Sequence, residues 1–546
     1  MIDKIRARLA AEETDIHPKA AAKLRIALAY PNVYRVGMAS LGYQIVYRLF
    51  NSMPDVSCER VFLPDEEDLQ EYRKTGTRLF SFETQTPVAD FDVLAFSLAF
   101  ELDYLNALRI MELAGLPIRS CRRTERHPLV IAGGVCTSFN PEPMAEFVDC
   151  FVIGDAEPVV PKVTEVLVSC ADCGRVEQLK NLSQIEGVYV PAFYEPRYDD
   201  NARLLGMTPM YGAPERVKRS LCRDLSSCPG MSAIVTRESE FGAVRLVEVT
   251  RGCGRGCRFC VTGFVNRPPR LRVLEAYVSQ EAHVSHAGRY GLIGASVFDH
   301  PGALDFCRRI IDAGGSFQVA SLRLESVTAE VASIIARSGQ KTLTIAPEAG
   351  TERLRCVIGK RCSDAQIEQA VGNATNAGLT RVRLYFMLGL PTERDEDVDA
   401  IADLLSRLTT RYAKTEFEVS VSSFVPKPWT PFQWHPMAEE RVLRNRYTRL
   451  KKAVAKMAKV KISGESPRLS MVQGLLARGD RRLSRVLEAA LRGSGDYRAA
   501  IRETQTEPAW YLYRARTKDE VFPWDHLDVG LDKDALWREY QEALAT

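Results

Sequence analysis

Short apolar runs alternate with amphipathic stretches in the first third of the chain. Five such runs occupy residues 24–30, 58–63, 92–98, 128–134 and 149–155. Runs that are apolar almost throughout indicate strands buried on both faces, and the intervening stretches have helical periodicity. The pattern predicts an α/β domain over residues 24–168, a doubly wound, Rossmann-like parallel sheet that follows a helical extension over residues 1–23. In such a sheet, ligands bind at the carboxyl ends of the strands.

The alternation weakens over residues 169–242, where a Pro- and Tyr-containing stretch predicts a hairpin and a linker. Regular alternation then resumes. Six further apolar runs occupy residues 244–250, 291–297, 315–322, 341–347, 381–388 and 418–426. Six strands with intervening helices predict a partial (β/α)6 barrel of the TIM type over residues 243–434, with its active site at the carboxyl ends of the strands. Residues 435–546 are expected to form a helical C-terminal domain.

Composition and charge exclude several classes of protein. Hydrophobic residues make up 46% and charged residues 26% of the 546 residues, which is typical of globular proteins. The net charge of +3 is too small to indicate a nucleic-acid or membrane-surface partner. The longest apolar run, residues 93–100, is shorter than the roughly 20 residues that span a bilayer, and residues 1–20 lack the apolar core of a signal peptide. With its 14 cysteines dispersed, we expect a cytoplasmic protein in a reduced compartment, with no membrane partner.

Three cysteines crowd onto one glycine-rich segment directly after the first predicted barrel strand. In RGCGRGCRFC, Cys253, Cys257 and Cys260 have C-x3-C-x2-C spacing. Three thiolates on one short loop suit a cubane iron–sulfur cluster, and the missing fourth protein ligand leaves one iron open to substrate. The alternatives are a zinc site and plain reduced cysteines. Zinc would require a fourth ligand, and neither alternative explains the aromatic Phe259 before the last cysteine.

This motif resembles that of the radical S-adenosylmethionine (SAM) superfamily, in which C-x3-C-x-aromatic-C stands at the end of the first barrel strand. The resemblance implies a [4Fe-4S] cluster held by the three cysteines, with SAM chelated to the fourth iron. It also implies SAM contacts at four positions in the cysteine loop, in APEAGTERLR and in YFMLGLPTE, namely Phe259, Glu348, Gly389 and Pro391. An alternative for Glu348 is that it caps the following helix at Thr351.

The second-strand segment GLIGASVFDHP departs from the superfamily pattern. It lacks the Gly-Gly-Glu that usually binds the amino group of SAM, and whether Ser296 or Asp299 replaces that motif stays open. The resemblance also implies an electron donor such as flavodoxin or ferredoxin, which would reduce the cluster.

The domain in front of the barrel resembles that of the cobalamin (B12)-binding subclass of the superfamily. Many cobalamin domains carry Asp-x-His-x-x-Gly after the first strand, and the histidine ligates cobalt. Here Asn32, Tyr34 and Gly37 hold that spacing. A phenol is a poor metal ligand beside an imidazole, so we expect cobalamin to bind without a histidine ligand. The resemblance implies cobalamin contacts at Tyr34, Gly37, Ser97, Gly133, Gly134 and Gly154. The alternative is that the glycines only turn the chain.

The resemblance extends over most of the chain, including residues 424–434 and 523–530, and is to an uncharacterised subfamily of B12-binding radical SAM proteins. It implies a B12-dependent radical methyltransferase acting on an unknown metabolite, peptide or RNA. The alternatives are a B12-dependent cyclisation or rearrangement, and a B12-free radical enzyme such as an RNA-modifying methylthiotransferase. A non-enzymatic iron–sulfur protein that transfers electrons or binds RNA is a further alternative.

Other chemical signals have simpler interpretations. The run over residues 441–461 carries nine Lys and Arg and no acid, and we interpret it as a solvated helix rather than an RNA-binding element. The pair Cys170 and Cys173 has no second pair at zinc spacing, so we interpret both as incidental thiols. His300 and His526 are candidate proton-transfer groups by residue type alone, and we expect both to be structural.

Overall fold

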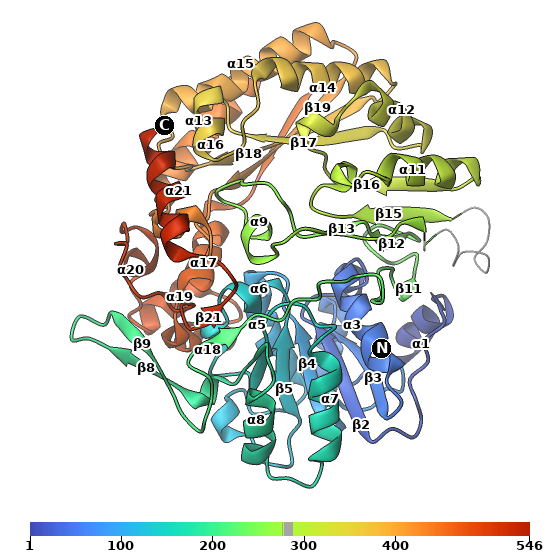
Figure 1. The fold of residues 1–546 in the computed structure, drawn as a ribbon, viewed down its shortest axis with the longest axis vertical. Helices are drawn as coiled ribbons and strands as arrows, with labels where there is room; N and C mark the ends of the chain where they lie inside the picture. Colours follow the sequence, from blue (N-terminus) through green and yellow to red (C-terminus); the bar gives the residue numbers. More distant parts are fainter. Residues whose placement is uncertain (276, 278–287) are drawn as a thin grey trace. The chain divides into compact units, whose positions relative to one another are not determined.

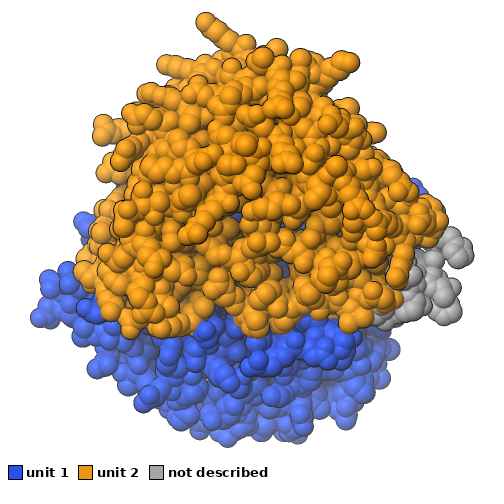
Figure 2. Space-filling view, turned by 45° about the horizontal axis from the view of Figure 1, so that its top comes forward, with its two compact units in different colours: residues 1–244, 475–508, 519–530 blue, residues 245–474, 509–518, 531–546 orange. Residues whose placement is uncertain are grey.

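The computed structural model describes residues 1–275, 277 and 288–546. The described chain forms two compact units, coloured separately in Figure 2. Unit 1 contains residues 1–244, 475–508 and 519–530, and unit 2 contains residues 245–474, 509–518 and 531–546. The C-terminal range 435–546 is therefore divided between the two units. No helix among the described residues is long and apolar enough to cross a membrane.

Unit 1 is built on a six-stranded sheet with strand order β3-β2-β4-β5-β6-β7 (Figure 1). The strands are β2 (Leu24–Tyr30), β3 (Val56–Phe62), β4 (Val93–Ser97), β5 (Leu129–Gly133), β6 (Cys150–Val152) and β7 (Val188–Tyr189). The first five pair in parallel, while β7 joins β6 antiparallel. The predicted doubly wound sheet is confirmed. Its order, with the first strand between the second and third, is that of a doubly wound fold with a switch point beside the first strand.

Helices cover the sheet of unit 1. They are α1 (Ile2–Ala10), α2 (Tyr34–Gly37), α3 (Leu41–Ser52), α4 (Glu66–Thr75), α5 (Tyr104–Leu113), α6 (Val135–Phe139), α7 (Val160–Ser169), α8 (Arg175–Ser183), α18 (Ser484–Arg492) and α19 (Tyr497–Glu503). Helix α3 packs on α7 and on β3, and α18 packs on α5. Side-chain caps fix three of these starts, since Ser40 accepts from Tyr43 N–H, Asp65 from Asp68 N–H and Asp496 from Arg498 N–H.

The predicted connector after residue 169 contains the expected hairpin, formed by β8 (Tyr194–Tyr198) and β9 (Leu204–Pro209). Two short pairings add distant segments to unit 1. Strand β1 (Glu13–Thr14) pairs antiparallel with β11 (Ile234–Val235), and β10 (Val217–Lys218) pairs in parallel with β21 (Leu527–Asp528).

Unit 2 contains the six predicted barrel strands in sequential order and one more. They are β12 (Arg245–Glu248), β15 (Arg289–Ile293), β16 (Ser316–Val319), β17 (Thr342–Glu348), β18 (Arg381–Leu388), β19 (Glu416–Ser423) and β20 (Val460–Gly464). The first three form one parallel sheet and the last four another. A parallel bridge between Leu322 and Ile345 continues the order from the β16 segment to β17. Strand β13 (Thr250–Arg251) follows β12 directly in the chain and pairs antiparallel with the short strand β14 (Arg270–Leu271). The predicted partial barrel is confirmed.

Helices follow most of the barrel strands. They are α9 (Thr262–Val265), α11 (Ala303–Asp312), α12 (Ala329–Arg337), α13 (Glu352–Val357), α14 (Asp364–Asn376), α15 (Asp395–Arg411), α16 (Glu440–Val454) and α21 (Lys533–Ala545). Helices α17 (Pro467–Arg478) and α20 (Pro508–Leu512) include the residues at which the chain passes from one unit to the other.

The basic run over residues 441–461 is helical only in its first part. Helix α16 ends at Val454, and the end of the run belongs to β20, so the expectation of one helix is wrong beyond that point. Two arginines of α16 pair with acidic partners in and before α15. Arg446 lies 2.7 Å from Glu393, and Arg449 lies 2.6 Å from Asp399. Arg444 also pairs with Glu440 of the same helix, so three of the six Lys and Arg of α16 have acidic partners in unit 2, which supports a structural role for this helix.

A buried polar cluster joins the late segment 519–530 to the rest of unit 1. His526 lies with its ring 4.6 Å from that of Tyr189, and its Nε2 is 3.9 Å from Glu142 Oε1. Glu142 accepts from Arg481 Nε at 2.9 Å and from the Tyr189 hydroxyl at 2.5 Å. Burial lowers the pKa of His526 from 6.5 to about 4, and the nearby carboxylate of Glu142 opposes that shift. His526 is therefore structural, as expected, and neutral at neutral pH.

We expect unit 1 to lose stability in mild acid because of His526. Between pH 6.5 and about 4 the unfolded chain binds a proton at this position and the folded chain does not, so the free energy of unfolding falls as pH falls. The full shift corresponds to about 3 kcal/mol. Chemical denaturation of His526→Phe across this pH range should show a shallower slope than wild type. His17→Gln, at an exposed histidine, should keep the wild-type slope, and an unchanged slope in His526→Phe would contradict the assignment.

Candidate functional site

The three cysteines of the motif lie on the loop between β13 and α9 in unit 2. Cys253, Cys257 and Cys260 are all thiols and all partly exposed. Backbone hydrogen bonds hold the loop: Cys260 N–H donates to Cys257 O at 3.0 Å, and Arg258 N–H donates to Ile358 O at 2.9 Å. The Arg258 guanidinium also donates to Val357 O at 2.9 Å. The loop is thus fastened to the end of α13.

Positive side chains surround the middle cysteine. Burial raises the pKa of the Cys257 thiol, while the cations of Lys360 and Arg323 favour its thiolate. Elsewhere on the loop, Arg255 lies 3.0 Å from Asp299, which follows β15. Sequence reasoning missed Lys360 and Arg323, since no spacing rule links them to the motif. It weighed Asp299 only as a substitute for a missing SAM-binding motif, and the structure gives it Arg255 as a partner.

The donor set fits an iron–sulfur cluster in its chemistry. Three thiols on one loop, near two cations that favour thiolate, are the ligands that a cluster requires. In the described part of the chain, no three His, Cys, Asp or Glu side chains already stand together at metal-binding distances. The cluster assignment of Cys253, Cys257 and Cys260 therefore stays a prediction from the motif, and binding would have to draw the three sulfurs together.

The residues predicted to contact SAM lie in the cysteine loop and at the carboxyl ends of β17 and β18. Glu348 ends β17 with φ of 70°, a left-handed conformation that costs energy in a non-glycine residue. It lies 3.1 Å from Lys360, which partly offsets the upward pKa shift that burial imposes on Glu348. The helix cap is Thr351 itself, which accepts from Leu354 N–H, so the capping alternative for Glu348 is wrong. Glu348 and Cys257 thus share one lysine.

The other SAM candidates are less polar. Gly389 follows β18, and its N–H donates to Glu393 Oε2 at 2.6 Å. Pro391 is buried and Phe259 is half-buried. Because the barrel strands are parallel, the ends of β17 and β18 lie on one edge of their sheet. The structure tests none of these contacts, and they remain predictions.

In unit 1, the predicted cobalamin residues stand at the carboxyl ends of β2, β4, β5 and β6. Tyr34 is buried, its hydroxyl donates to Glu12 at 2.5 Å, and its ring stacks on Phe82 at 5.4 Å. Its hydroxyl is therefore engaged inside the domain rather than presented to a ligand. Asn32, two residues earlier, donates to Asp103 at 3.0 Å, and burial raises the pKa of Asp103 to about 6. Sequence reasoning missed this buried carboxyl at the strand ends.

Close backbone packing explains some of the glycines at the strand ends without a ligand. Gly134 and Gly154 have positive φ, and a Cβ there would lie 2.4 Å from Leu98 O and 2.1 Å from Ser220 O. Both positions therefore require glycine whether or not a ligand binds.

The other predicted cobalamin residues are packed differently. Gly37 packs its backbone closely against the Phe62 ring. Ser97 and Gly133 are register partners on β4 and β5, and a Cβ at Gly133 would lie 3.7 Å from Val152 Cβ, an ordinary contact, so this position does not require glycine.

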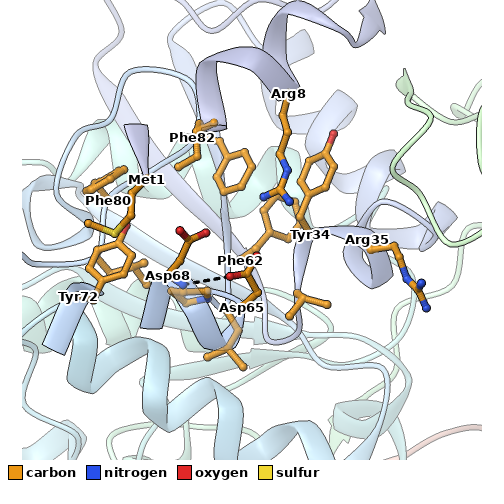
Figure 3. Close-up of a pocket in the computed structure, with 15 residues that line it drawn as sticks. Met1, Arg8, Tyr34, Arg35, Phe62, Asp65, Asp68, Tyr72, Phe80 and Phe82 are labelled. Carbon is orange, nitrogen blue, oxygen red and sulfur yellow. Dashed lines mark hydrogen bonds between the residues drawn. The ribbon is translucent and has the colours of Figure 1, made fainter. Parts of the chain in front are cut away.

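A cavity of about 240 Å³ lies under α1, beside the ends of β2 and β3. Five of the fifteen residues that line it are aromatic, and Figure 3 shows Met1, Tyr72 and Phe80 gathered on one side and Arg8 extending beside Tyr34. The Arg8 guanidinium lies 5.0 Å from the centre of the Tyr34 ring. Tyr34 is thus part of an aromatic wall as well as of a buried hydrogen-bond network.

Comparison with known families and structures follows the same division of the chain. The family described as "Radical SAM proteins, N-terminal" matches residues 42–191, and the "Radical SAM superfamily" matches residues 247–405. An uncharacterized protein of Methanocaldococcus jannaschii is 29% identical over 471 residues, which are 85% of this chain and 90% of that protein.

Two solved structures share the fold. The radical S-adenosylmethionine methyltransferase TsrM from Kitasatospora setae, with cobalamin and a [4Fe-4S] cluster bound, is 14% identical, covers 88% of this chain and 99% of its own, and has a TM-score of 0.54. The cobalamin-dependent S-adenosylmethionine radical enzyme OxsB, with aqua-cobalamin and S-adenosylmethionine bound, is 12% identical. It covers 96% of this chain and 80% of its own, with a TM-score of 0.50. At these identities the likeness establishes the shared fold.

Proposed function

The chain belongs to the radical SAM superfamily, and from that premise we propose that it is a cobalamin-dependent enzyme that transfers a methyl group to an unactivated carbon. Cys253, Cys257 and Cys260 would hold a [4Fe-4S] cluster, and the strand ends of unit 1 would hold cobalamin. When bound, the cluster and SAM supply one-electron chemistry that removes a hydrogen atom from the substrate, and cobalamin supplies the methyl group. A flavodoxin or ferredoxin would provide the electron.

The cysteine loop carries the radical SAM part of this proposal. The thiolate is the state that binds iron, and the cations of Lys360 and Arg323 oppose the rise that burial causes in the pKa of Cys257. Lys360 also pairs with Glu348 at the end of β17, so the same cation contacts a predicted SAM-binding residue and acts electrostatically on a predicted cluster ligand. The pair between Arg255 and Asp299 holds the start of the loop. These contacts would orient both groups at one edge of the barrel.

The fold shared with TsrM and OxsB supports cobalamin, since both of those proteins are described with it bound. Tyr34 occupies the position at which many cobalamin domains have the cobalt-ligating histidine. Its hydroxyl donates a hydrogen bond to Glu12, so this side chain would not reach cobalt. Ser97 and Gly133 are both half-buried at neighbouring strand ends, where such a ligand would lie. We propose that cobalamin binds here without a protein imidazole.

A methylthiotransferase is less well supported. A second cluster would require three cysteines at the strand ends of the first domain. Cys58 and Cys150 lie within β3 and β6 and are buried, and Cys136 is buried in α6. Among the described residues, these cysteines do not share a loop that could hold a second cluster.

Cobalamin content tests the proposal. Protein purified from cells supplied with B12 should retain stoichiometric cobalamin, and electron paramagnetic resonance of its Co(II) state should lack nitrogen splitting from an axial imidazole. Gly133→Val should lose cobalamin and keep iron, because the added side chain would stand at the strand end that the proposal gives to cobalamin, while its Cβ meets no contact shorter than 3.7 Å. Gly174→Val, at an open position before α8, is the matched control and should keep both.

Two results would overturn parts of this proposal separately. Protein that cleaves SAM to 5′-deoxyadenosine on reduction but never retains cobalamin is a B12-free radical enzyme. Nitrogen splitting in the Co(II) spectrum that changes when the histidines are labelled with 15N would show that a histidine from elsewhere in the chain reaches the cobalt, because the label leaves the base of cobalamin itself unchanged.

A further inference from the structure

Two cysteines outside the cluster motif face each other in the connector of unit 1. The sulfur atoms of Cys222 and Cys228 lie 3.2 Å apart, and the two residues close a loop around Asp224. Both thiols point at Asp224 O, from Cys222 Sγ at 3.1 Å and from Cys228 Sγ at 3.8 Å. The pair is therefore held together by a shared acceptor as well as by chain connectivity.

The first cysteine of this pair is anchored to the carboxyl end of β6. Ser220 forms a parallel bridge with Gly154, and Asp155 N–H donates to Ser220 O at 3.0 Å. In return, Cys222 N–H donates to the Asp155 carboxylate at 2.9 Å. Cys222 is almost fully buried, whereas Cys228 is partly exposed. One thiol is fixed, and the other is accessible to a reagent in solution.

The other cysteines outside the motif differ in their surroundings. Cys58, Cys150 and Cys307 are buried, and burial raises the pKa of each thiol. Buried thiols of raised pKa react slowly with oxidants, because the thiolate is the reactive form. Cys170 and Cys173 are also near neighbours, but their contact lies at the end of α7 and involves no segment distant in sequence.

We propose that Cys222 and Cys228 form a reversible disulfide that closes the loop over residues 222–228. A disulfide bond is about 2.05 Å long, so the sulfurs need to approach by about 1.2 Å, which rotation of the Cys228 side chain can supply. The co-reactant is a low-molecular-weight disulfide. The Cys228 thiolate attacks one of its sulfurs and releases one thiol, and the Cys222 thiolate then attacks Cys228 Sγ in the mixed disulfide and releases the second.

The exchange balances in atoms and electrons. One S–S bond of the reagent breaks and one S–S bond of the protein forms. The protein dithiol loses two electrons and two protons, and the reagent disulfide gains them and becomes two thiols. The oxidised loop stays attached to the end of β6 through the hydrogen bonds of Ser220 and Asp155, so oxidation would stiffen the connector at that point.

Tryptic mapping of the anaerobically reconstituted full chain tests this site directly. Arg223 lies between the two cysteines, so trypsin separates residues 220–223 from residues 224–237. After incubation with oxidised glutathione and alkylation of the remaining thiols, we expect these two peptides to appear as one disulfide-linked species. Dithiothreitol should release them. Cys58, Cys150 and Cys307 should be recovered only in alkylated form after unfolding.

Two variants make the result decisive. In Cys228→Ser the linked species should vanish, and Cys222 should stay alkylatable. The variant with Cys253, Cys257 and Cys260 all replaced by alanine removes competing thiols and should still form the link. Separate alkylated peptides in both the wild type and this variant would overturn the proposal, as would Cys222 linked to any cysteine other than Cys228. Glutathione retained on Cys228 without closure would also overturn it.

Discussion

Chains in which Cys253, Cys257 and Cys260 are all alanine should bind no iron–sulfur cluster. Without the three thiolates, the loop after β13 offers no ligand set, and the cations of Lys360 and Arg323 have no thiolate to balance. Anaerobic reconstitution should load the wild type with about four irons per chain and the variant with none. Iron and sulfide analysis and the visible absorption spectrum measure the difference, and reductive SAM cleavage should be lost with the cluster.

A matched variant separates the motif from cysteine content in general. Cys121, Cys170 and Cys173 are also at least partly exposed, and alanine at all three should leave iron content unchanged. If the motif variant retained a full complement of iron, the ligands would lie elsewhere and the assignment of the loop would be wrong.

The largest effect on stability is expected at Arg60, on β3 in unit 1. Its guanidinium donates to both Glu12 oxygens at 2.7 Å and to Glu83 at 2.5 Å. The three side chains are 2%, 1% and 9% exposed. Arg60→Met leaves two buried carboxylates without their cation, and removing one partner from a buried ion pair costs about 3–5 kcal/mol. Chemical denaturation should show a loss of that size.

Two comparisons show whether the loss comes from the unpaired charges. Arg383→Met breaks an exposed pair with Glu418 on neighbouring strands of unit 2 and should cost about 0–1 kcal/mol. Adding Glu12→Gln and Glu83→Gln to Arg60→Met removes the buried charges and should recover much of the stability. A triple variant as unstable as Arg60→Met would indicate that lost packing dominates instead.

The strands were the most predictable part of the fold, because burial on both faces leaves a direct trace in the sequence. The apolar runs at residues 24–30 and 381–388 coincide with β2 and β18. Strand β20 was not predicted. It is mostly exposed, and it follows α16 after a short turn, so its residues continue the charge pattern of the helix. The sequence around β20 contains no apolar run that would predict a strand.

The candidate site divides in the same way. The cysteine ligands could be predicted because all three lie on one loop, where spacing in sequence is spacing in space. Lys360 and Arg323 come from other loops, and nothing local to them indicates a thiolate partner. Likewise, Glu12 meets Arg60 across 48 positions, a contact that only the folded sheet creates. Contacts between residues far apart in the sequence could not be predicted from the local pattern.

The divided order of unit 1 along the chain has a consequence for its synthesis on the ribosome. All six strands of the sheet lie within the first 189 residues. Glu142 and Asn140, however, have partners near the other end of the chain. Arg481 pairs with Glu142, and the carbonyls of Ala477 and Gly479 accept from Asn140. Until those residues emerge, the carboxylate of Glu142 lacks its cation and the amide of Asn140 lacks these two acceptors. The barrel strands are translated in that interval, so unit 1 begins first but cannot be completed until all of the barrel strands have been synthesised.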